Sequence, residues 1–169
     1  MLIENEGFLD HPADEVYPLV RDEMTKLLPF LPDVERVEQL SYDRESPTRV
    51  RIVNRWHTKP KMPALVARFL PAEIFSWTDY ALWKDDEYLT DYRLEGFGYD
   101  VKGTNSFVPD GPGTKIRITA DVTIHPEKFH IPRLLFDRVF PLVEDTIRHA
   151  IEPNLSSLVR ALKDYFAAR

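Results

Sequence analysis

The feature that most constrains this chain is the apolar pattern of residues 130–169. Apolar side chains recur there at spacings of three and four, which predicts one long amphipathic helix. Its stripe consists of Leu135, Val139, Leu142, Val143, Ile147, Ala150, Ile151, Leu155, Leu158, Leu162, Tyr165 and Phe166. Pro141 and Pro153 interrupt the stripe, and an interior proline removes a backbone hydrogen bond. We expect either a kinked core helix or two helices that meet near Pro141, and a bend would also wrap the helix over a cavity.

The size and composition of the chain narrow the classes of function. A chain of 169 residues fits a single domain, 1–169, that is long enough to bury a hydrophobic core. The net charge of −6 disfavours a nucleic-acid partner, because phosphate contacts require a clustered positive face. The chain has no cysteine, which excludes disulfides and thiolate metal sites. No phosphate-binding loop, dinucleotide fingerprint or His-Glu-x-x-His motif is present, and we expect no cofactor and no metal.

The N-terminal sequence MLIENEGF carries two acidic residues where a signal peptide would carry positive charge. No window approaches the roughly 20 apolar residues of a membrane span. We therefore expect a cytoplasmic monomer or homodimer without a membrane-spanning segment.

The order of predicted elements indicates an α+β domain. Residues 2–9 suit a strand, and Pro12, Asp14 and Glu15 then suit the start of a helix that ends near Pro29. Hydrophobic alternation predicts further strands at about 34–42, 49–57, 75–84, 87–97, 99–108 and 115–125. A short helix is expected between the third and fourth strands, where Pro63 and Pro71 flank an apolar segment. Successive antiparallel strands with helices on one side form such a domain.

Two segments give the chain a resemblance to a known family. They are GFLDHPADEVYPLVRDEMTKLLPFLPDVERVEQLSYD near the start and IEPNLSSLVRALKDYF near the end. The chain resembles the START/polyketide-cyclase superfamily (SRPBCC), which has the helix-grip fold of the birch pollen allergen and of bacterial coenzyme-Q-binding proteins. The charged residues at 43–46 depart from the allergen-type members, which carry a glycine-rich loop there.

The resemblance implies a specific architecture. A curved antiparallel sheet of seven strands would wrap around the long C-terminal helix, with two short helices after the first strand. It also implies an internal cavity for an apolar ligand. Fold alone does not assign a function, because one architecture can host many.

Several polar residues fall on strand faces that otherwise look buried. Asn54 lies between Ile52 and Trp56, and Asp79 lies between Trp77 and Ala81. A buried polar group is costly unless it is hydrogen-bonded, and a pocket would supply a partner. The predicted ligand-binding residues are Asn54, Asp79, Tyr92 and Asn105, enclosed by Trp56, Trp77, Trp83 and Phe107. The alternatives are polar pairing inside a filled core and a wrong face for the fourth strand, since a one-residue shift in register reverses the face.

The segment between the third and fourth strands has two interpretations. Met62, Leu65, Val66 and Phe69 form one apolar side of the expected short helix. These residues are either a lid at the mouth of the pocket or an ordinary plug of the core.

Three functions are compatible with these patterns. The first is binding or transport of a hydrophobic small molecule, such as a lipid, a quinone or a polyketide-like ring system. The second is an aromatase/cyclase-type enzyme in which Asp79 or Tyr92 donates or accepts a proton. The third is a protein-interaction module with a filled core and an apolar surface patch around Met62, Phe69 and Leu70.

Overall fold

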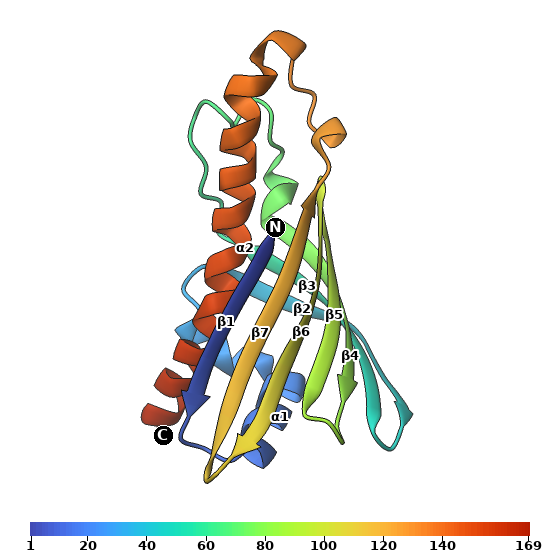
Figure 1. Ribbon diagram of the computed structural model, residues 1–169, viewed down its shortest axis with the longest axis vertical. Coiled ribbons are helices and arrows are strands. Elements are labelled where there is room, and N and C mark those ends of the chain that lie inside the picture. Colours follow the sequence, from blue (N-terminus) through green and yellow to red (C-terminus); the bar gives the residue numbers. More distant parts are fainter.

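The computed structural model describes residues 1–169, and its strands and helices are arranged as Figure 1 shows. The strands are β1 (Leu2–Leu9), β2 (Val34–Ser46), β3 (Arg49–Thr58), β4 (Ser76–Lys84), β5 (Leu89–Gly96), β6 (Tyr99–Asp110) and β7 (Gly113–Ile124). The α-helices are α1 (Ala13–Asp22) and α2 (Phe136–Ala167). Short 3-10 helices are η1 (Met24–Phe30), η2 (Ala72–Phe75), η3 (Pro126–Lys128) and η4 (Arg133–Leu135). The two short helices predicted after the first strand are α1 and η1.

The seven strands form one antiparallel sheet in the order β1-β7-β6-β5-β4-β3-β2. Each strand from β2 to β6 pairs with the next along the chain, and β1 pairs with β7 to complete the order. The sheet curves, and α2 runs along it (Figure 1). This arrangement of a curved sheet and a long C-terminal helix confirms the predicted α+β helix-grip architecture.

The core lies between the sheet and α2. Strand β7 shows how it is built, because Ile116, Ile118, Ala120 and Val122 are buried and alternate with more exposed polar residues. On the other side, α2 buries Val139, Val143, Ile147, Ile151, Leu158 and Leu162. These residues belong to one hydrophobic cluster of 37 side chains.

Helix α2 is continuous through both prolines. Pro141 and Pro153 lie inside its 32 residues, so the structure has one helix rather than two that meet near Pro141. The helix begins at Phe136, later than position 130, and Leu135 therefore lies outside it with 39 % of its surface exposed. None of the helices has both the length and the apolar character that crossing a bilayer requires.

The short helix predicted between β3 and β4 is present as η2, but it lies after the apolar segment in which it was expected. Residues 62–70 form hydrogen-bonded turns, in which the Pro63 carbonyl accepts from Val66 and the Val66 carbonyl accepts from Leu70, and the short helix η2 comes later, at 72–75. The hydrogen bonds of this segment run to the Pro63 and Val66 carbonyls, which gives two successive turns and not a continuous helix. Strand β2 is also longer than the predicted 34–42, because residues 43–46 remain paired with β3.

Candidate functional site

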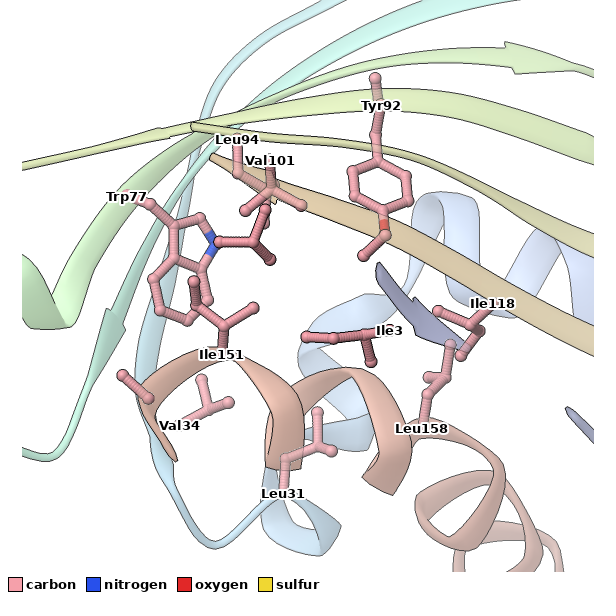
Figure 2. Packing of buried hydrophobic residues seen from close by; sticks show 14 of the residues in the cluster. Ile3, Leu31, Val34, Trp77, Tyr92, Leu94, Val101, Ile118, Ile151 and Leu158 are labelled. Carbon is pink, nitrogen blue, oxygen red and sulfur yellow. The ribbon is translucent and has the colours of Figure 1, made fainter. Parts of the chain in front are cut away.

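A cavity of about 90 Å³ lies between the concave face of the sheet and α2. Thirteen of its 17 lining residues are hydrophobic. The lining residues are Val20, Met24, Leu31, Trp56, Trp77, Asp79, Ala81, Trp83, Thr90, Tyr92, Leu94, Asn105, Ile118, Ile151, Asn154, Leu155 and Leu158. Figure 2 shows two of them, Trp77 of β4 and Ile151 of α2, facing each other between sheet and helix. An apolar space with a few polar groups is typical of a small-molecule site.

The cavity brings together six of the eight residues predicted to bind a ligand. Trp56, Trp77, Asp79, Trp83, Tyr92 and Asn105 all line it. Asn54 and Phe107 do not. Phe107 is fully buried behind Trp83, with the two ring centroids 6.3 Å apart, and Asn54 is half-buried on β3 opposite Asp79.

Two polar lining residues were not among the predicted ones. Thr90 lies on β5 on the same face as Tyr92, and the alternation of that strand could have identified it. Asn154 lies on α2 after Pro153, and its side-chain amide donates a 2.7 Å hydrogen bond to the Ala150 carbonyl. No sequence signal separates Asn154 from an ordinary helical asparagine.

The polar atoms of the cavity differ from other buried polar atoms of the protein. Thr58, Thr114 and Thr146 are buried, and each hydroxyl donates to a backbone carbonyl at 2.6–2.8 Å. Four buried side-chain atoms have no hydrogen-bond partner in the protein, and these are Trp56 Nε1, Asp79 Oδ1, Thr90 Oγ1 and Asn105 Oδ1. All four of these residues line the cavity. Since an unpaired buried polar group costs about 1–3 kcal/mol, the unpaired groups are concentrated where a ligand could satisfy them.

Asp79 is the ionisable group of the cavity whose pKa is shifted to near neutral pH. Burial raises the pKa of its carboxyl from 3.8 to about 7. The indole N–H of Trp56 opposes this rise in pKa from nearby, without a hydrogen bond of normal geometry between them. A carboxyl of this kind exchanges its proton near neutral pH, which suits a proton donor or acceptor.

Tyr92 has a different chemistry from Asp79. Its hydroxyl donates a 2.8 Å hydrogen bond to the Thr119 carbonyl of β7. Burial first, and then the nearby Asp79 charge, raise its pKa above the ordinary value for tyrosine. The hydroxyl is therefore engaged and hard to ionise, which leaves Asp79 as the stronger of the two predicted proton-transfer groups.

The four residues predicted to form a lid do not line the cavity. Val66 is fully buried, Met62 and Phe69 pack against the hydrophobic core, and Leu65 is 52 % exposed. Packing against the core accounts for the first three, and the lid stays a prediction. Because Leu70 is buried as well, Met62, Phe69 and Leu70 do not form the apolar surface patch expected of an interaction module.

The chain is similar to several proteins of known structure. No family model matches the sequence, and no curated protein matches it either. Among solved structures, TTHA0849 from Thermus thermophilus is 22 % identical, with a TM-score of 0.68 over 99 % of this chain and 98 % of that one. The Zhui aromatase/cyclase from Streptomyces sp. R1128 is 18 % identical, with a TM-score of 0.63 over 99 % and 97 %. Norcoclaurine synthase from Thalictrum flavum is 15 % identical, with a TM-score of 0.59 over 100 % and 87 %.

At these identities the similarity concerns the fold. The chain has the helix-grip fold that its resemblance to the START/polyketide-cyclase family predicted.

Proposed function

We propose that this protein binds a small, mainly apolar molecule in the cavity between the sheet and α2. The observation that carries the proposal is the convergence of all four unpartnered buried polar atoms on this one cavity. Native interiors rarely leave such groups unpaired, and their grouping at one place points to a ligand with polar atoms of its own.

The volume of the cavity bears on the kind of ligand. A dry cavity of about 150 Å³ can hold benzene, whereas this cavity measures about 90 Å³. A compact or slender molecule therefore fits the cavity of this structure better than a whole lipid, quinone or polyketide-like ring system. Each of these larger molecules would require the walls of the cavity to move. The broader proposal is that the protein also binds or transports such larger molecules.

A second candidate function is catalysis. The raised pKa of Asp79 favours it, because a carboxyl that titrates near pH 7 inside an apolar cavity can give or take a proton at neutral pH. Two of the structural neighbours are named as enzymes, an aromatase/cyclase and a norcoclaurine synthase, which supports this candidate at the level of fold. In an enzyme of this kind Asp79 would contact the reacting atoms.

The binding proposal is tested by native mass spectrometry of the purified protein, followed by solvent extraction and analysis of any released molecule. A stoichiometric apolar ligand is expected. The matched variants are Ala81→Leu, which narrows the cavity, and Ala67→Leu, which adds the same bulk on the surface. The ligand should be lost from the first variant and retained by the second, with both folds intact by circular dichroism. If the measured mass is that of the protein without a ligand, and the protein binds none of a panel of small apolar compounds, the proposal is contradicted.

A further inference from the structure

The polar groups of the cavity lie at two separate ends of it. Trp56 of β3 is directly opposite Trp77 of β4, two residues from Asp79. Thr90 of β5 is directly opposite Asn105 of β6. Asp79 is opposite Leu94, which is four residues from Thr90 along β5, or about 13 Å at roughly 3.3 Å per residue. One end of the cavity therefore has Trp56 and Asp79, and the other has Thr90 and Asn105.

On the sheet side, the wall between the two ends offers no free polar group, and the polar lining residue of α2 is Asn154, whose side-chain amide is bonded to the Ala150 carbonyl. Ala81 and Tyr92 are opposite each other there, and the Tyr92 hydroxyl is already bonded to the Thr119 carbonyl. Ile151 and Leu155 add apolar surface from α2. A ligand that satisfies both ends must be elongated, with an apolar middle.

The first end favours an acceptor atom on the ligand. The indole of Trp56 can only donate a hydrogen bond. None of the lining residues is Lys, Arg or His, so no cation inside the cavity compensates an ionised Asp79. An uncompensated buried carboxylate takes up a proton, and the neutral carboxyl then has an O–H to donate. Two donors beside each other suit one carbonyl oxygen, and the lack of a basic side chain disfavours ligands that carry a carboxylate or phosphate there.

The second end suits a group that both donates and accepts. The Thr90 hydroxyl can do either, and the unpaired Asn105 oxygen accepts. A ligand hydroxyl matches this combination because it can donate to Asn105 and accept from Thr90.

We propose that the cavity binds an uncharged, slender hydroxy-carbonyl compound, whose carbonyl oxygen lies between Asp79 and Trp56 and whose hydroxyl lies between Thr90 and Asn105. The proposal rests on the binding function above and specifies its ligand. It requires Asp79 to be protonated in the complex, which the rise of its pKa to about 7 supports. Tyr92 is the only other lining residue that titrates, and its raised pKa keeps it neutral over the relevant pH range.

The probes are ω-hydroxy-2-alkanones of about four to nine carbons, measured by calorimetry at about pH 6 and pH 8; the longer ones exceed the volume of the cavity and bind only if its walls move. Three comparison series replace one group each: 2-alkanones lack the hydroxyl, ω-hydroxy acids carry a carboxylate in place of the ketone and should bind more weakly, and amino alcohols carry an ammonium in place of the ketone. Affinity should reach a maximum at one chain length and exceed that of the matched 2-alkanone about tenfold, the value of one well-formed hydrogen bond. It should fall about tenfold from pH 6 to pH 8 as Asp79 ionises.

Two conservative variants assign the ends of the ligand. Thr90→Val keeps the shape of the side chain and should remove the advantage of the hydroxy-ketone, while 2-alkanones bind as before. Asp79→Asn keeps an N–H donor that does not titrate, and it should bind the hydroxy-ketone equally at both pH values. A merely structural role of either residue would affect all ligands alike and at both pH values.

The outcomes separate this inference from the function on which it rests. Amino alcohols that bind more tightly at pH 8 than at pH 6 would overturn the neutral carbonyl end while leaving a binding protein. Hydroxy-ketones that bind no better than 2-alkanones would overturn the two-ended arrangement. Failure of every series, with a different molecule extracted from the native protein, would overturn the ligand class alone, and failure of every series with an empty native protein would overturn both proposals.

Discussion

Tyr92 of β5 and Gly103 of β6 are directly opposite each other, and the tyrosine ring covers the glycine. A Cβ atom at Gly103 would lie 2.5 Å from the Tyr92 hydroxyl oxygen and would also collide with the Thr119 carbonyl that this hydroxyl bonds. Tyr99 and Gly96 repeat the relationship on the same two strands with the residues exchanged. In both pairs the glycine gives the ring the room to cross the neighbouring strand.

The substitution Gly103→Ala should destabilise the protein. The added methyl group meets a backbone carbonyl as well as the Tyr92 side chain, so rotation of one side chain cannot relieve the contact. We expect the free energy of unfolding to fall by about 1–3 kcal/mol, as for other overpacked sites. Urea denaturation measures the change, and a stability equal to that of the wild type would show that the tyrosine ring does not lie over Gly103.

Stability should depend on pH through Asp79. Burial raises its folded-state pKa from 3.8 to about 7, so the folded protein holds this proton more tightly than the unfolded chain does. The stabilising contribution of the protonated carboxyl is therefore complete below about pH 4 and is lost as the pH rises through 7. For a shift of this size the loss at this one residue is up to about 4 kcal/mol.

The variant Asp79→Asn isolates that effect because an amide does not titrate. The difference in unfolding free energy between the variant and the wild type should move in favour of the variant between about pH 5 and pH 8. Urea denaturation at several pH values across this range provides the measurement. If the two proteins followed parallel pH profiles, Asp79 would have an ordinary pKa and the cavity would be open to bulk water.

The strand faces could be predicted from the sequence because side chains alternate strictly along a strand. That period placed Trp56, Asp79 and Asn105 on the face that lines the cavity. Alternation defines a face and not a depth, and for this reason it could not separate Trp83, which lines the cavity, from Phe107, which lies behind it. Alternation places Thr90 on the same face as Tyr92, but its lack of a hydrogen-bond partner, which distinguishes it from an ordinary strand threonine, becomes visible only in three dimensions.

The helices could be predicted less fully. The apolar stripe predicted α2. It did not predict the residue at which the helix begins, because that start depends on the geometry of Pro132 and η4 and not on periodicity. Residues 62–70 show apolar spacings of three and four, yet their hydrogen bonds run to the Pro63 and Val66 carbonyls and form two turns in place of a helix. The spacing of apolar residues alone therefore does not show whether the backbone completes a helix.

Tyr99 should stabilise the segment that precedes β4. Its buried hydroxyl donates a 2.9 Å hydrogen bond to the Ile74 carbonyl in η2. Tyr99→Phe leaves that carbonyl without this partner, and we expect a loss of about 1–2 kcal/mol in unfolding free energy. Hydrogen exchange followed by mass spectrometry should show faster exchange in residues 72–76. Exchange that stayed the same there, with stability unchanged, would contradict an anchoring role of the hydroxyl.

Asp85 should connect α1 to the turn between β4 and β5. Its carboxylate accepts hydrogen bonds from the Tyr17 hydroxyl at 2.9 Å and from Arg44 at 3.3 Å, and it pairs with Arg21 at 2.7 Å. Partial burial alone would raise its pKa, but the hydrogen bonds from Arg21 and Tyr17 outweigh burial and lower it. The contribution of Asp85 to stability is therefore present above the unfolded-state pKa and is lost as the pH falls through the folded-state value.

The variant Asp85→Asn removes the charge and keeps the shape of the side chain. Because hydrogen bonds to a charged group contribute about 1.5–3 kcal/mol each, and the amide retains only part of them, we expect a loss of about 2 kcal/mol at pH 7. The difference from the wild type should shrink by about pH 3, where the wild-type carboxylate is itself becoming protonated. Asp86→Asn is the matched control, since the neighbouring Asp86 is more exposed and pairs with Arg49 at the surface. A loss at Asp85 that was the same at pH 3 and pH 7 would mean that packing, and not its charge, holds α1 against the turn.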